Sequence, residues 1–101
     1  MKYISFIASL VFASTAAAQQ VEVCSLLGDL AEKIMVIRQG GIPPGLVLST
    51  LVKDDNSETV NQIIVSLVKT AYAQPRYTTE IFQTRSVADF RSDAETTCLF
   101  E

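Results

Sequence analysis

The sequence predicts an all-α fold: a compact bundle of about four helices closed by one disulfide that joins the first and last helices. Two observations lead to this prediction. Apolar residues recur with helical spacing in segments that glycine and proline pairs separate. Two cysteines occur, Cys24 and Cys98, one near each end of the predicted domain. Since a domain of this size has a marginal core, a covalent link between its ends is expected.

The first 18 residues have the order of a secretory signal. Lys2 gives a basic start, an apolar run follows, and Ala16 and Ala18 are the small residues that precede a cleavage site. The apolar run has about 11 residues, well short of the roughly 20 that span a bilayer. We therefore expect residues 1–18 to be removed and residues 19–101 to form a single helical domain in the periplasm, not embedded in a membrane.

Export to an oxidising compartment lets the two cysteines form a disulfide. Closing a loop of about 75 residues would stabilise the fold by roughly 4 kcal/mol in the chain-entropy model. The alternative, two free thiols that act as a redox or metal pair, has less support. Cys24 and Cys98 lack the CxxC spacing of such pairs, and the chain has no histidine.

The first mature helix is expected over residues 24–39 and is expected to end at Gly40-Gly41. Gly28 weakens it and indicates a close crossing with another helix. A second, short helix is expected over 45–52, with Pro44 in its first turn. The apolar face predicted for the first helix consists of Cys24, Leu26, Leu27, Leu30, Ala31, Ile34, Met35 and Ile37.

The third helix is expected over residues 57–73, with Asp55 as its cap and Glu58 completing a capping box. Its β-branched residues would also suit a strand, but the run is too long and its apolar spacing is helical. The predicted inner face consists of Val60, Ile63, Ile64, Leu67, Val68, Ala71 and Tyr72.

Pro75 ends the third helix, and Thr78 or Thr79 is expected to cap a fourth one that ends near Leu99. The inner face predicted for this last helix consists of Ile81, Val87, Ala88, Phe90, Ala94 and Cys98. Both cysteines therefore fall on apolar faces, where a bridge between the helices would have to lie.

The chemistry-bearing residues favour a protein that is not an enzyme. Without histidine, Ser-His and Cys-His catalysis is excluded, and no nucleotide or calcium motif implies a cofactor or metal. A hydrolase with paired carboxylates is the least expected function, because the candidate acids occupy solvent positions. These acids are Asp29, Glu32, Asp89, Asp93 and Glu95.

The net charge of −3 becomes −4 when Lys2 is removed with the signal. An acidic chain with no basic run argues against nucleic acid as a partner.

Two arginines interrupt predicted apolar faces, Arg38 in the first helix and Arg91 in the fourth. An unpaired internal charge is costly, so each guanidinium needs a partner. One explanation is structural: the side chains cross the core and bind a carbonyl or an acid such as Glu95. The other is that one of them contacts an anionic group on a partner. The sequence leaves both open.

The corner between the third and fourth helices is the candidate partner-binding surface. It contains Tyr72, Arg76 and Tyr77, residue types enriched at interface hot spots, and Phe82 lies just beyond it. The same residues could instead clamp a tight turn between helices, with Phe82 closing over the corner.

Three segments, IMVIRQG (34–40), AYAQPRYTTE (71–80) and VADFR (87–91), accompany the signal and the early and late cysteines. Together they resemble a group of small exported proteins of proteobacteria and their phages. This resemblance implies a helical periplasmic domain and no particular activity. The overall plan is also similar to that of phage Spackle proteins, which inhibit a phage tail lysozyme in the periplasm. That second likeness is one of architecture, without a shared motif.

The leading functional hypothesis is a periplasmic interaction module that binds a protein or an envelope component. For a phage or prophage protein, superinfection exclusion or lysozyme inhibition would be the more specific form. The alternative is a carrier of small apolar ligands with a pocket near Arg38 or Arg91. An apolar void of about 300 Å³ or more, with an arginine at its mouth, would favour the carrier.

Overall fold

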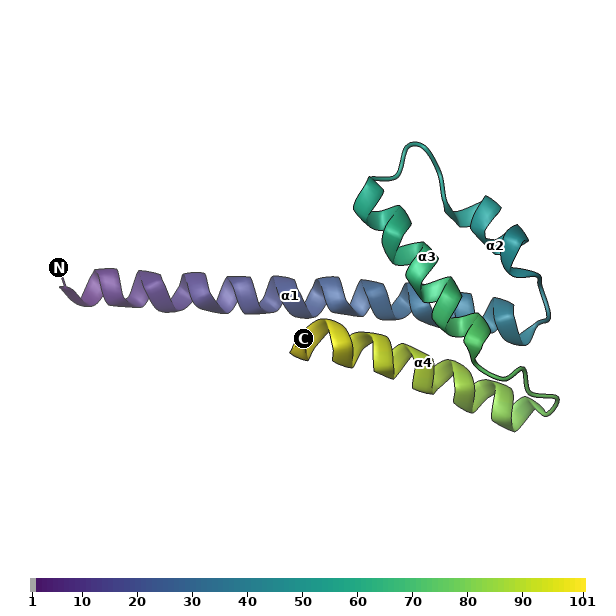
Figure 1. The fold of residues 1–101 in the computed structure, drawn as a ribbon. Coiled ribbons are helices and arrows are strands. Elements are labelled where there is room, and N and C mark those ends of the chain that lie inside the picture. The colour runs from purple at the N-terminus through teal and green to yellow at the C-terminus, as the bar shows by residue number, and fades with distance from the viewer. Residues whose placement is uncertain (1) are drawn as a thin grey trace.

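The computed structural model describes residues 2–101, and their side chains from residue 17 onward. None of these residues lies in a strand, and a disulfide joins the first helix to the last, as predicted. Figure 1 shows the four helices, which are α1 (Lys2–Gln39), α2 (Pro44–Leu51), α3 (Glu58–Ala73) and α4 (Glu80–Phe100).

Helix α1 begins much earlier than the expected start at Cys24. It is continuous from Lys2 and runs through the predicted cleavage site. The physical reason is local: no glycine or proline occurs before Gly28, and alanine, glutamine and glutamate favour a helix. The N-terminal part of α1 projects past the other helices (Figure 1), so α1 sets the longest dimension, 63 Å.

Helix α1 ends where the two glycines predicted an end. Gly41 adopts a φ of +83°, a left-handed conformation that favours glycine. The Gly41 amide donates to the Arg38 carbonyl at 3.0 Å and the Ile42 amide to the Ile37 carbonyl at 3.4 Å. These two bonds form a Schellman motif, which satisfies carbonyls at the end of the helix and turns the chain toward α2.

The predicted cap of α3 at Asp55 is wrong. Ser57 is the N-cap, and its Oγ accepts the Val60 amide at 3.1 Å. The Asn56 side chain donates to Asn61 Oδ1 at 2.9 Å, and Asn61 donates in turn to the Lys53 carbonyl at 2.9 Å. These asparagines hold residues 53–56 in a turn, so the helix begins later than the acidic residues suggested.

Helix α4 starts after Thr79, one of the two predicted caps, although the Thr79 side chain makes no capping hydrogen bond. It lies along α1, its main packing partner, whereas α3 packs on α1 and α2 and diverges from α4 (Figure 1). Ile81 and Ala88 are therefore exposed, contrary to prediction, because they point away from α1.

The core lies where α1, α2, α3 and α4 converge. Leu26, predicted to be internal, is 63% exposed because it projects away from the helices that cover α1. Val60 and Ile63 are also exposed, since α3 diverges from α4 at that end. The buried core consists of Ala31, Ile34, Met35, Val47, Ile64, Val68, Ala71 and Phe90.

Candidate functional site

A buried glutamine organises the corner between α3 and α4. Gln39, the last residue of α1, is 4% exposed. Its Nε2 donates to the Pro75 carbonyl at 2.9 Å and to Ser86 Oγ at 3.4 Å, and its Oε1 accepts the Tyr77 amide at 2.8 Å. One side chain therefore fixes the corner backbone and the first part of α4 against the end of α1.

Three of the residues singled out from the sequence stabilise this corner. Arg76 Nε donates to the Gln39 carbonyl at 3.2 Å, and the Tyr72 hydroxyl donates to the Ile42 carbonyl. Arg38 donates to the Gln74 carbonyl at 3.0 Å, and its guanidinium lies 5.0 Å from the centre of the Tyr72 ring. These contacts agree with the structural alternative, in which the residues clamp the turn.

Tyr77 and Phe82 remain available to a partner. Tyr77 is 36% exposed and Phe82 is 49% exposed, and their ring centres lie 5.9 Å apart. The Arg85 guanidinium lies 5.6 Å from the centre of the Phe82 ring. Gln83 Nε2 donates to the Tyr77 carbonyl at 2.7 Å, which holds this aromatic pair at the start of α4.

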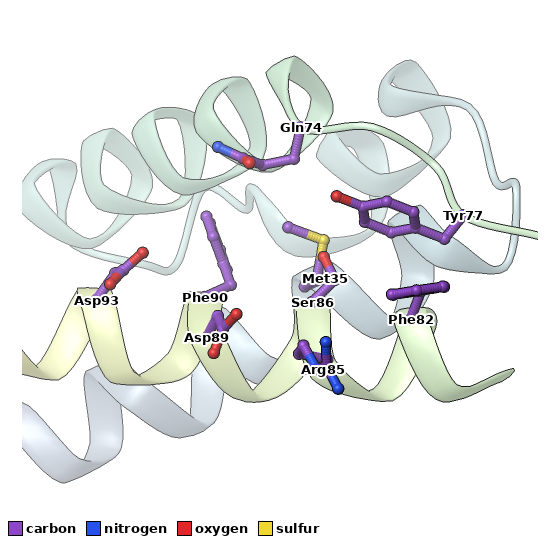
Figure 2. A pocket seen from close by; sticks show the side chains of 9 residues that line it. All are labelled: Met35, Gln74, Tyr77, Phe82, Arg85, Ser86, Asp89, Phe90 and Asp93. Carbon is purple, nitrogen blue, oxygen red and sulfur yellow. The ribbon is translucent and has the colours of Figure 1, made fainter. Parts of the chain in front are cut away.

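The aromatic pair borders a hollow of about 120 Å³ (Figure 2). Figure 2 shows the Tyr77 ring directed into the hollow from one side and Phe90 rising from α4 on the other. The remaining lining side chains are Met35, Gln74, Phe82, Arg85, Ser86, Asp89 and Asp93.

A second, larger hollow of about 350 Å³ continues from the first between α3 and α4. The two hollows share Gln74, Phe90 and Asp93, so they adjoin, and we refer to the two together as the depression. We call the larger hollow the α3–α4 groove. Its lining consists of Leu27, Ile63, Ser66, Leu67, Thr70, Gln74, Phe90, Asp93, Ala94 and Thr97.

The acidic residues of the two long helices fall into two groups. Arg91 forms ion pairs with Asp29, with Glu32 at 3.3 Å and with Glu95 at 2.9 Å. The hydrogen bond that Arg91 donates to Asp29, together with the nearby charges of Asp29, Glu95 and Glu32, raises the pKa of the Arg91 guanidinium further above its ordinary value. Arg91 therefore links α4 to α1, and its single positive charge is shared among three carboxylates.

Asp89 and Asp93 form the second group. They lie four residues apart on α4, both are exposed, and both line the first hollow. In the part of the chain whose side chains are described, neither has a cationic partner within ion-pair distance. Two carboxylates without an ion-pair partner among the described side chains therefore lie on the rim of the first hollow, which Arg85 also lines, and the apolar lining belongs to the α3–α4 groove.

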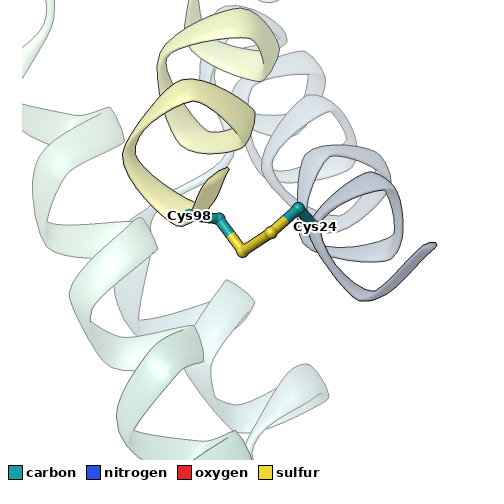
Figure 3. The surroundings of a disulfide bond; sticks show 2 residues. All are labelled: Cys24 and Cys98. Carbon is teal, nitrogen blue, oxygen red and sulfur yellow. A yellow bond between two sulfur atoms is a disulfide. The ribbon is translucent and has the colours of Figure 1, made fainter. Parts of the chain in front are cut away.

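The Cys24–Cys98 disulfide joins α1 to α4 at the end far from the corner (Figure 3). The Cα atoms lie 5.5 Å apart, within the usual range. Gly28 lies one turn further along α1, where a Cβ atom would come within 2.6 Å of Glu95 Cγ. The close crossing that Gly28 predicted is therefore present. Helix α4 is therefore held to α1 near both of its own ends, by the disulfide at Cys98 and by Gln39 at Ser86.

Sequence reasoning missed Gln39 and the α3–α4 groove. Gln39 was identifiable in principle, because it continues the buried stripe of Ala31 and Met35 at helical spacing and directly precedes two glycines. The groove depends on the angle between α3 and α4, which no periodicity encodes.

Comparisons with protein-family models, curated proteins and solved structures find no match to this chain. Among the residues described, no helix has a stretch long and apolar enough to cross a bilayer. No group of three cysteine or acidic side chains in the same part of the chain is arranged to hold a metal ion.

Proposed function

We propose that this protein is exported to the periplasm and acts there as a protein-interaction module. Its binding surface is the depression that begins at Tyr77 and Phe82 and continues along the α3–α4 groove. The observation that supports this most directly is the exposed aromatic pair, held in place beside a hollow that adjoins the mainly apolar α3–α4 groove. Aromatic side chains anchor interfaces because they bury a large area at a low cost in conformational entropy.

The proposal narrows the surface inferred from the sequence. Tyr72, Arg76 and Arg38 hold the corner together, so substituting them would disturb the fold as well as any binding. Tyr77 and Phe82 expose their rings, and they are the residues to test. The likeness to small exported phage and bacterial proteins, and lysozyme inhibition as a specific form of the function, stay predictions.

A carrier of small apolar ligands is the second candidate. The groove volume of about 350 Å³ lies in the range of ligand pockets, which favours this class. The other feature expected of a carrier is an arginine at the mouth of the pocket. Neither Arg38 nor Arg91 is among the described residues that line the groove, and Asp93 lies at its edge. A carboxylate at the head of an apolar ligand would be repelled there, so a protein partner is the better fit.

Photo-crosslinking in intact cells tests the proposed function. The full chain is expressed with p-benzoylphenylalanine at position 82, which keeps an aromatic ring there, and osmotic-shock fractionation follows irradiation. We expect a covalent adduct with another protein in the periplasmic fraction. The matched control places the same amino acid at Ser92, which is exposed on α4 about 160° around the helix from Phe90. Absence of an adduct at position 82, or the same adducts from both positions, would contradict the proposal.

A further inference from the structure

We propose that the α3–α4 groove binds an amphipathic helix of a partner protein, one with a row of apolar side chains flanked by lysine or arginine. This inference rests on the proposed function and names the class of partner. Three features support it: the apolar floor, the open shape of the groove and the negative charge of its rim.

The floor of the groove presents apolar side chains from three helices. Leu27 comes from α1, Leu67 from α3 and Ala94 from α4, and each is only partly buried. Ile63, on the wall formed by α3, is 37% exposed. Because α3 and α4 both pack on α1 but diverge from each other, no described side chain fills the space between them. An added helix could bury these side chains between the two walls.

The shape of the groove favours a helix over the other occupants of an apolar hollow. An extended peptide gains most of its affinity by hydrogen bonding to the free edge of a sheet, and the groove is bordered by helices. A small ligand is held when most of its surface is enclosed, and this groove is open to solvent on one side. An amphipathic helix satisfies its own backbone and needs only an apolar trough for one face.

The charge of the rim specifies the flanking residues of the partner. Asp89 and Asp93 are four residues apart on one helix, a spacing at which like charges destabilise each other. Arg85 lines the first hollow beside Asp89 but does not line the groove, so Asp93 is the charge nearest the apolar floor. Asp93 lies where the two hollows meet, so a cation bound there would also be close to the groove. A lysine or arginine beside the apolar row of the partner would relieve the repulsion between the two carboxylates and fix the register of binding.

Binding of designed peptides to the oxidised, exported protein tests the proposal. The first probe is a labelled peptide of about four helical turns, with leucines along one face and lysines elsewhere. The second replaces every lysine with glutamate. The third has the composition of the first, rearranged so that its leucines share no face. Fluorescence anisotropy is expected to show binding of the first peptide at least about tenfold tighter than of either other peptide, a difference of roughly 1.4 kcal/mol.

Paired variants locate the binding site. The double variant Asp89→Asn/Asp93→Asn is expected to bind the lysine peptide about 3- to 10-fold more weakly at low salt, and its binding should depend less on salt concentration. The control Asp54→Asn/Asp55→Asn makes the same change in net charge at an exposed turn and should leave binding unchanged. Ile63→Ser in the groove should weaken binding by at least about fivefold, whereas Val65→Ser, exposed on another face of α3, should not.

Any of the following results would overturn the proposal. The first is equal binding of the lysine and glutamate peptides, and the second is an equal loss in the two asparagine double variants. The third is that the lysine peptide does not bind whereas a fatty acid does, and that Ile63→Ser weakens the binding of the fatty acid. This result would identify the groove as a site for a small ligand. An adduct at position 82 without peptide binding refutes this inference alone, whereas the absence of both refutes the proposed function as well.

Discussion

Replacing Gln39 with methionine tests how the end of α1 holds the corner. Methionine keeps the length of the side chain but cannot accept the Tyr77 amide or donate to the Pro75 carbonyl, bonds of 2.8 and 2.9 Å. Each partly buried backbone group left without a partner costs about 1–3 kcal/mol. Because the corner is partly accessible to solvent, the lower part of that range applies to each group. The expected loss of unfolding free energy is about 2–4 kcal/mol.

Urea denaturation of the oxidised protein measures this loss. With a slope of about 1.5 kcal/mol per molar urea, a loss of 3 kcal/mol lowers the midpoint by about 2 M. Gln62→Met is the matched control, since Gln62 is exposed on α3 and, among the described side chains, its amide bonds only to Glu58, at 3.4 Å. A midpoint for Gln39→Met within about 0.3 M of the Gln62→Met midpoint would refute the role assigned to Gln39.

Two further predictions concern the contact between α1 and α4. Replacing Cys24 and Cys98 together with alanine removes a link across a sequence separation of 74 residues and should lower the unfolding free energy by about 4.5 kcal/mol in the chain-entropy model. A loss below about 1 kcal/mol in urea denaturation would show that packing alone closes this loop. Gly28→Ala should raise the unfolding free energy by about 1 kcal/mol, through a higher helix propensity, only in a protein that also carries Glu95→Ala. With Glu95 in place, the added Cβ displaces the Glu95 side chain from its rotamer and from Arg91. The same change in unfolding free energy from Gly28→Ala in the presence and in the absence of the Glu95 side chain would contradict the close crossing of α1 and α4.

Much of the fold follows from local signals in the sequence. Gly40 and Gly41 end the first helix because the left-handed turn there needs a glycine, and Pro75 ends the third because of the restriction on Gln74. The pairing of Cys24 with Cys98 follows from there being two cysteines in a small chain whose first residues predict export. These features depend on few residues, close in sequence or unique in number.

The features that escaped prediction depend on contacts between distant segments. Ser57 replaced Asp55 as the cap because Asn61, in the next turn of α3, holds the preceding turn in place. Asp29 is exposed, as predicted, but its ion pair with Arg91 depends on where α4 lies against α1. Ile63 has the spacing of a core residue, and its exposure depends on how far α3 diverges from α4. Periodicity identifies an apolar face without saying whether another helix covers it.

The unequal attachment of the two groove walls bears on how such a protein could diversify. Helix α4 is fixed to α1 by the disulfide at one end and through Gln39 at the other, whereas the groove-facing side of α3 is partly uncovered. Substitutions at Ile63 or Thr70 would reshape the groove and leave the pinned pair of helices unchanged. Over evolutionary time, descendants of this chain could therefore exchange one partner for another through mutations confined to a single helix face, at little risk to folding.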